Sequence, residues 1–269
     1  MPDLPGEKNR SATAPRYVEP RIERTYRVRF DEAGPDGNLR SGGYLRFAQD
    51  LAWIHSESAG FGREWYAERG LFWLVRGVEL EILEALEFGS ELVVSTQVIG
   101  FRRVIARRRS EMRRVGSERI VALALTDWVL LNDAGRPVRP PDEIPEAFGT
   151  MSDFTTLRVA PGAVPGDANT RNFVVRRSET DPMAHVNNAG YVDYLDEQYL
   201  AMYEAPIEAP LPLPRRYRAE FVGSATPGAR LTGRSWQSEL AWCYRLADDD
   251  GHELFRATLE VDPATWVGG

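Results

Sequence analysis

The sequence predicts an α+β protein built from two similar units in tandem, each with one long helix packed on an antiparallel sheet. Two observations lead to this prediction. The first half of the chain aligns with the second half in two separate windows. Each half also shows the same order of local patterns: a short strand, a polar turn, a helix, and then a run of strands. Two such units side by side would bury their sheets together as an internal pseudo-dimer.

The repeat is visible at two nearly equal offsets. Residues 29–47 align without a gap on residues 176–194, an offset of 147, with identical residues at 29/176, 32/179, 35/182, 43/190 and 44/191. Residues 79–92 align on residues 218–231 at an offset of 139. Either window alone could match by chance, but two windows in the same order favour a duplication.

Each copy opens with a strand, predicted at residues 25–30 and 172–177, and continues into an amphipathic helix. The helices are predicted over about residues 41–58 and 188–203, with Asn188 as the N-cap of the second. The remaining strands are predicted at residues 71–83, 91–101, 104–115 and 119–132 in the first copy, and at residues 215–221, 230–239, 241–249 and 252–262 in the second.

Composition suggests the limits of the units. Residues 1–21 are rich in proline and in small or polar residues, which is typical of a disordered tail. We expect the first unit over residues 22–148, a connector rich in Pro, Gly and Ala over residues 149–170, and the second unit over residues 171–269.

Charge and cysteine content exclude several classes of protein. A formal net charge of −7 argues against a general nucleic-acid binder. The single cysteine, Cys243, allows neither an intrachain disulfide nor a cysteine-rich metal site, and we expect no metal and no cofactor. The chain has neither a signal-peptide pattern nor an apolar run of about eighteen residues. We therefore expect a cytoplasmic protein without a membrane span.

The densest cluster of polar chemistry is DPMAHVNNAGY, residues 181–191. The aligned segment of the first copy, GPDGNLRSGGY (34–44), keeps the same glycine and tyrosine, which the fold itself would require. The first copy has glycine, asparagine, arginine and serine at the positions of Asp181, His185, Asn187 and Asn188. A role in catalysis therefore explains these four side chains better than a requirement of the fold does.

With these motifs in place, the sequence resembles the acyl-acyl carrier protein (acyl-ACP) thioesterases of plants and bacteria, which consist of two fused hot-dog domains. The segments at 48–62, 70–82, 89–109 and 124–145 resemble that family's N-terminal domain in order and spacing. The D-x-x-x-H-V-N-N-x-x-Y pattern and YRAEF (217–221) resemble its catalytic domain. The resemblance implies a double hot-dog thioester hydrolase of fatty acid biosynthesis that releases free fatty acid from acyl-ACP, as a monomer or a homodimer.

Carried over by position, the resemblance makes Asp181, His185 and Glu220 the catalytic residues. The sequence departs from the family's pattern at two positions: Met183 stands in place of an asparagine, and Phe221 stands in place of a cysteine. Hydrolysis by water requires a base and an oxyanion site but no protein nucleophile. Asp181 or Glu220 would be the base, and His185 would orient the water or pass a proton to the departing thiol. The helix start at Asn187 and Asn188 would stabilise the oxyanion.

Two larger groups of residues are candidates for substrate contacts. An acyl pocket is expected in the first unit, where the candidates are Phe47, Leu51, Ile54 and Trp73. The segment 102–114 holds seven arginines and one acid, which suits either a solvated strand edge or a docking site for an acidic carrier protein. The candidate docking residues are Arg102, Arg103, Arg107, Arg108 and Arg109.

Two alternatives stay open. The first is an acyl-CoA thioesterase of the same fold, since the phosphates of CoA would also suit an arginine-rich strip. The second is a non-catalytic acyl-binding protein, which the methionine at position 183 favours because a thioether cannot replace an amide as a hydrogen-bonding group.

Overall fold

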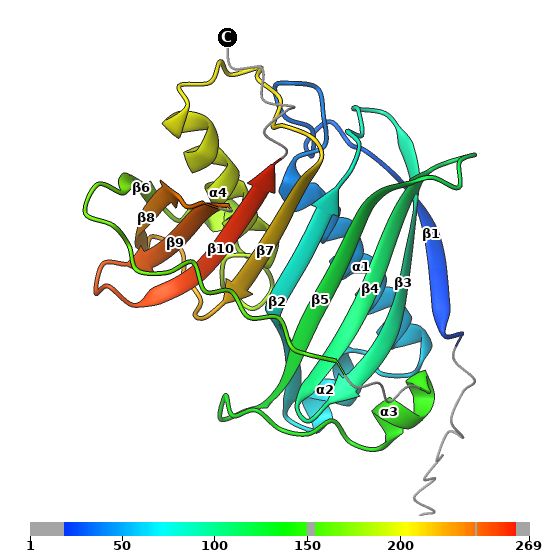
Figure 1. The fold of residues 1–269 in the computed structure, drawn as a ribbon. Helices are drawn as coiled ribbons and strands as arrows, with labels where there is room; N and C mark the ends of the chain where they lie inside the picture. The colour runs from blue at the N-terminus through cyan, green and yellow to red at the C-terminus, as the bar shows by residue number, and fades with distance from the viewer. Residues whose placement is uncertain (1–18, 150–153, 240, 262–269) are drawn as a thin grey trace, which may run out of the picture.

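The sheet and its two long helices form two layers (Figure 1). The computed structural model describes residues 19–149, 154–239 and 241–261. Within these residues the ten strands form one antiparallel sheet in the order β1-β3-β4-β5-β2-β7-β10-β9-β8-β6. The first five strands of that order come from the first half of the chain and the last five from the second half. The α+β prediction with two tandem units is confirmed.

The elements of the first half are β1 (Arg21–Arg27), α1 (Ser41–Ser58), α2 (Arg63–Glu68), β2 (Leu71–Ile82), β3 (Glu91–Arg102), β4 (Ile105–Arg114), β5 (Ile120–Asn132) and α3 (Glu143–Phe148). Those of the second half are β6 (Asn169–Val174), the short 3-10 helix η1 (Arg177–Glu179), α4 (Asn188–Met202), β7 (Arg215–Phe221), β8 (Arg230–Gln237), β9 (Trp242–Asp248) and β10 (Glu253–Val261).

The first strand of each half differs most from its prediction. β1 and β6 lie three to four residues earlier than expected. They end before Val28 and Val175, because the backbone N–H groups of these two residues donate to Ser90 and Ala229, which lie in loops. The short helices α2 and α3 were not predicted, since six residues are too few to show a helical period. Parts of the expected tail, connector and second unit (residues 1–18, 150–153 and 262–269) lie outside the described residues.

The two halves repeat the same backbone hydrogen bonds at the offsets that align their sequences. The N–H of Leu39 donates to the carbonyl of Leu86 (2.7 Å), and the N–H of Val186 donates to that of Ala225 (2.9 Å). Three further pairs of bonds are related in the same way: Val28 to Ser90 and Val175 to Ala229, Gly89 to Val28 and Gly228 to Val175, and Arg40 to Glu32 and Asn187 to Glu179. This agreement supports the duplication that the sequence indicates.

The halves meet around a pseudo-twofold axis between β2 and β7. Glu79 of β2 lies opposite Arg218 of β7, and these two positions are equivalents of one another at the offset of 139. Their side chains form an ion pair, with Nε of Arg218 3.4 Å from Oε2 of Glu79. On the helix side, Arg46 of α1 pairs with Asp193 of α4, its own equivalent at the offset of 147. A symmetric dimer of either half would place like charges together at both positions.

A buried polar cluster joins the two halves beneath the helices. The hydroxyl of Tyr217 donates to Oδ1 of Asp196 on α4 (2.7 Å) and lies 2.8 Å from Oγ of Ser41, the first residue of α1. Arg215 donates to both hydroxyls, to that of Tyr217 over 3.0 Å and to that of Ser41 over 3.1 Å. Burial raises the pKa of Asp196 to about 6, so these contacts are made where water cannot replace them.

The connector crosses the sheet on the face opposite the helices, as Figure 1 shows in green. The backbone N–H of Leu157 donates to Oδ2 of Asp127 (2.9 Å), and that of Val159 donates to Oε2 of Glu220 (3.2 Å). Arg107 also donates to the carbonyl of Thr155 (3.0 Å). Carboxylates on the outer face therefore hold the connector along the sheet.

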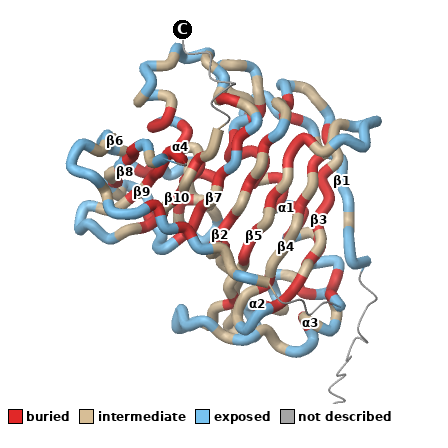
Figure 2. The backbone as a smooth tube through the Cα atoms, viewed as in Figure 1, coloured by how far each residue is buried: buried red, intermediate tan, exposed pale blue. Residues whose placement is uncertain are grey.

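The core follows the sheet through both halves, and Figure 2 shows buried residues on strands of both halves. One cluster of buried residues extends from Leu51 and Leu80 in the first half to Tyr191 and Phe255 in the second. A second cluster lies under α2 and α3 and includes Phe61, Tyr66 and Phe148. No helix within the described residues is long and apolar enough to cross a membrane.

The pairing of Arg46 with Asp193 can be tested by exchanging the charges. Arg46→Asp or Asp193→Arg alone places like charges together, and each should lower the free energy of unfolding by about 1 kcal/mol, because the pair is partly exposed and screened. The double exchange should recover most of the loss, which chemical denaturation would measure. Losses in the double variant equal to the sum of the single losses would contradict a direct interaction.

Candidate active site

The turn before α4 carries the candidate catalytic residues. The backbone N–H of Asp181 donates to the carbonyl of His185 (2.9 Å), so the two residues lie across a tight turn. Ala184 closes this turn with a φ of +61°, where the first copy has Gly37 at +77°. An alanine in this region is strained, because its Cβ crowds the backbone. Strain of this kind is common where a functional loop is held in one conformation.

Both candidate side chains are partly accessible, as a reaction with substrate requires. Asp181 and His185 are each half-buried. Oδ1 of Asp181 accepts the backbone N–H of Met183 (2.8 Å), which leaves Oδ2 available. The side chain of Met183 is 43% exposed and points to solvent, so its backbone and not its thioether serves the turn.

The start of α4 supplies a candidate oxyanion site. Asn187 is the N-cap, one residue earlier than predicted, and its Oδ1 accepts the backbone N–H of Ala189 (3.0 Å). The backbone N–H of Asn188, the first helical residue, makes no hydrogen bond to any described residue. A free N–H at a helix N-terminus favours negative charge.

A groove of about 410 Å³ opens beside this turn. Asp181 and Asn187 line it from the turn, Asp193 and Glu197 from α4, and Arg46 from α1 of the other half. His185 does not line this groove. No motif in the sequence singles out Arg46. Its alignment with Asp193 at the offset of 147 was the signal that could have placed it here, since equivalent positions near a twofold axis meet.

Glu220 lies on the opposite face of the sheet from this turn. Residues alternate between faces along a strand. Phe221 packs its ring on Tyr191 of α4, and Tyr217 bonds to Asp196 of the same helix, so Glu220 points away from α4. The expectation that Glu220 joins Asp181 and His185 therefore does not match the geometry.

The carboxylate of Glu220 is fully engaged where it lies. Its side chain is 2% exposed, and Nη2 of Arg76 approaches Oε1 to 2.8 Å. Nε of Arg256 donates to Oε2 over 2.9 Å, and the N–H of Val159 reaches the same oxygen. In this position the carboxylate neutralises two guanidinium groups and holds the connector.

The expected acyl-pocket residues do not surround one cavity in the described structure. Phe47 and Leu51 are buried in the main core, and Ile54 packs against the same core. Trp73 packs against the second cluster and donates its indole N–H to Tyr66 (3.0 Å). None of the four lines the groove at the turn.

The expected docking arginines are divided between the two faces of β4. Arg107 forms a bidentate pair with Asp127, with contacts of 2.6 and 2.8 Å, under the connector. Arg108 points to the helix side, where Nη1 lies 3.0 Å from Nδ1 of His55. Arg109 pairs with Glu111. Arg102 and Arg103, at the β3–β4 turn, are exposed. The five residues therefore do not form a single basic surface.

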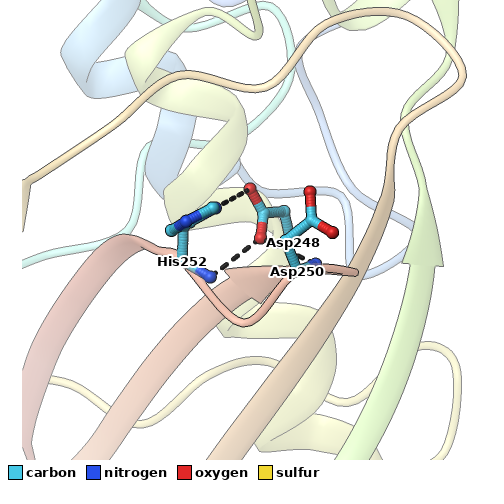
Figure 3. A group of neighbouring side chains, drawn as sticks. All are labelled: Asp248, Asp250 and His252. Atoms are coloured by element: carbon cyan, nitrogen blue, oxygen red, sulfur yellow. Dashed lines mark hydrogen bonds and ion pairs between the residues drawn. The ribbon is translucent and has the colours of Figure 1, made fainter.

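The third histidine belongs to a hairpin turn between β9 and β10 (Figure 3). Oδ1 of Asp248 accepts the backbone N–H groups of Asp250 (3.1 Å) and His252 (2.8 Å). Nδ1 of His252 lies 3.3 Å from Oδ2 of Asp248. The three side chains are close enough to hold a cation, but their hydrogen bonds account for the turn.

Comparisons with known proteins identify the first half of the chain. Residues 19–148 match the family model described as the acyl-ACP thioesterase N-terminal domain. No curated protein matches the sequence.

Solved structures resemble nearly the whole chain. A candidate oleoyl thioesterase from Lactobacillus plantarum has a TM-score of 0.78 at 17% identity, over 90% of this chain and 97% of its own. The acyl-ACP thioesterase from Bacteroides thetaiotaomicron has a TM-score of 0.71 at 15% identity, over 89% and 97%. The 12:0-ACP thioesterase from Umbellularia californica has a TM-score of 0.72 at 21% identity, over 90% and 97%. At these identities the likeness establishes the fold, and it confirms the expected double hot-dog arrangement.

The role of Glu220 can be separated from catalysis with a matched variant. Glu220→Gln and Asp127→Asn each remove a buried carboxylate that binds arginine and the connector. Both should lower the free energy of unfolding by about 3 kcal/mol, since each leaves a guanidinium without its partner. Both should keep the turnover number within a few-fold of the parent at a temperature where the variants are folded. If Glu220→Gln alone lowered the turnover number more than tenfold, Glu220 would have a role in catalysis.

Proposed function

We propose a substrate and catalytic residues for this chain on the basis of its family. Its residues 19–148 place it in the acyl-ACP thioesterase family. The chain is a thioester hydrolase with a double hot-dog fold. We propose that it releases a free fatty acid from an acyl carrier protein at the turn before α4. The supporting observation is that Asp181 and His185 lie across one tight turn that leads into α4, and that Asp181 lines a groove formed by both halves.

The proposed reaction uses water as the nucleophile. Asp181 accepts a proton from water while the water oxygen bonds to the thioester carbon, and the carbonyl oxygen takes up the negative charge. The N–H of Asn188 donates to that oxygen, and one such donor typically contributes roughly 3–4 kcal/mol to the barrier reduction. The carbon–sulfur bond then breaks, and His185 relays the proton from Asp181 to the thiolate. The products are the acid and the carrier thiol.

Asp181 is the better base of the two carboxylates considered. Its Oδ2 makes no hydrogen bond to a described residue, whereas both oxygens of Glu220 contact guanidinium groups. Glu220 is therefore assigned to the sheet and the connector.

Acids dominate the charge of the groove, which restricts what can enter it. Asp181, Asp193, Glu197 and Glu179 line it together with a single arginine, Arg46. The uncharged amides of a pantetheine arm can enter such a groove, but phosphate groups and an acidic protein surface would be repelled. An acidic carrier should therefore dock away from the groove, and Arg102 and Arg103 are the proposed contacts. An acyl-CoA ester is the second candidate substrate, because it shares the same arm.

The catalytic residues have matched controls in the first copy. Asp181→Asn and His185→Ala should each lower the turnover number by about 10²–10⁴-fold, the range for general acid–base groups. Asp36→Asn and Asn38→Ala alter the equivalent turn of the first half, where Asp36 also accepts a backbone N–H, and should leave turnover nearly unchanged. Steady-state kinetics on an acyl-ACP would measure both pairs. Full activity in Asp181→Asn and His185→Ala would exclude this site.

Carrier recognition can be separated from chemistry by comparing acyl donors. Arg102→Ala with Arg103→Ala should raise KM for acyl-ACP several-fold without changing the turnover number, because docking charges act on association. The same variant should not change KM for an acyl thioester of N-acetylcysteamine, which has no carrier. Arg230→Ala, an exposed arginine on β8, is the control. Equal rates on acyl-ACP and acyl-CoA in parent and variant would favour the acyl-CoA alternative.

A further inference from the structure

Arg108 is a cation inside the first half that the catalytic site does not use. It lies on β4 and faces the layer of helices, where His55 of α1 and the ring of Phe148 of α3 contact it. Its guanidinium carbon is 5.4 Å from the centre of the Phe148 ring. Burial lowers the pKa of Arg108 to about 10, but the group stays protonated at neutral pH.

No described carboxylate pairs with Arg108. Its one hydrogen bond to the described residues is the contact of Nη1 with Nδ1 of His55. Nε2 of His55 lies 2.8 Å from the carbonyl of Glu19, so that nitrogen carries the proton and Nδ1 accepts from Arg108. Burial, followed by the charge of Arg108, lowers the pKa of His55 to about 4. The histidine is therefore neutral, and the local charge is positive.

The other unsatisfied group at this place is also a donor. Trp128 lies opposite Ala106, two residues from Arg108 on the same face of neighbouring strands. Its indole N–H is buried and has no partner among the described residues. Nε and Nη2 of Arg108 likewise make no hydrogen bond there, and part of this side chain stays accessible. Two donor groups without an acceptor among the described residues suit an anionic ligand.

The walls around these donors are apolar. Tyr66 uses its hydroxyl to accept from Trp73 and to bond to Ser56, so it offers no free acceptor. Phe148, which contacts Arg108, belongs to the second core cluster, and Trp128 packs against it; the other aromatic residues of that cluster or packed on it include Phe61, Trp65, Trp73 and Phe101. A ligand for this place would combine an anionic group with an apolar body.

We propose that Arg108 and the indole N–H of Trp128 bind the carboxylate of a fatty acid inside the first half. The proposal rests on the proposed function, because the hydrolysis of an acyl thioester produces such a carboxylate. A guanidinium and an N–H donor can engage both oxygens of one carboxylate. The same chemistry would accept a carboxylate at the far end of an acyl substrate, so the experiment must separate these two sources.

Binding can be measured without turnover in a His185→Ala background. Calorimetric titration with decanoate should show binding that weakens at least tenfold when Arg108→Met is added. Arg109→Met is the matched control, because Arg109 is the next residue on β4 and pairs with Glu111 on the other face; it should leave binding unchanged. Decanol, which lacks the charge, should bind more weakly than decanoate. Equal decanoate affinity in the Arg108→Met and Arg109→Met proteins would overturn the proposal.

Stability without ligand gives an independent readout. Without ligand, Arg108→Met should have the same thermal midpoint as the parent or a higher one, because it removes an unpaired charge. Decanoate should raise the midpoint only in proteins that keep Arg108. A purely structural arginine predicts the reverse: a lower midpoint, and the same decanoate shift in parent and variant. That result would reject the site even if the calorimetry were ambiguous.

Hydrolysis then identifies the source of the carboxylate. If the ligand is the product, Arg108→Met should relieve inhibition by added decanoate, and Arg109→Met should not. If the ligand is a distal carboxylate, the variant should instead lose kcat/KM for the monothioester of a dicarboxylic acid. If the protein binds decanoate through Arg108 but hydrolyses neither substrate, the proposed function is wrong and the proposed binding site stands.

Discussion

The pairing of β2 with β7 is the constraint on which the rest of the structure depends. It joins two five-stranded halves into one sheet, and it places α1 and α4 in contact above the joint. The Tyr217 hydroxyl fixes that contact, because it bonds to Asp196 on α4 and to Ser41 at the start of α1 in a place that excludes water. A Cβ at Gly42 would lie 2.9 Å from the carbonyl of Ala189, so the helices approach as closely as a glycine allows. The groove beside the proposed catalytic turn is lined by residues of both helices.

The duplication explains how the proposed catalytic residues can lie on one half only. Both copies keep the backbone hydrogen bonds that form the turn, so the turn itself is a structural requirement of the fold. The side chains on it are then free to differ. The second copy places an acid and a histidine there, and tolerates a strained Ala184, whereas the first copy has glycines at positions 34 and 37. Because Arg46 and Asp193 carry opposite charges, each half pairs more favourably with the other half than with a second copy of itself.

The two faces of the sheet have separate tasks. The helix face holds the core, the proposed catalytic turn and Arg108, while the outer face binds the connector through Asp127 and Glu220. The carboxylates on the outer face also pair with partly buried arginines: Asp127 with Arg107, and Glu220 with Arg76 and Arg256. Two arginines that are adjacent in the sequence can therefore serve opposite faces of one strand, as Arg107 and Arg108 do.

The sequence by itself determined the local pattern: the bounds of α1, most strands, the repeat, and the turn with Asp181, His185, Asn187 and Asn188. These features depend on neighbours along the chain, or on a comparison of one copy with the other. Only the tertiary structure decided which face Glu220 occupies, that Arg46 reaches the catalytic groove, and that Arg108 lies inside without a counter-ion among the described residues. Each of these depends on contacts between elements far apart in the sequence. A shift of one position along a strand changes the face, and the physical surroundings, of every side chain on it.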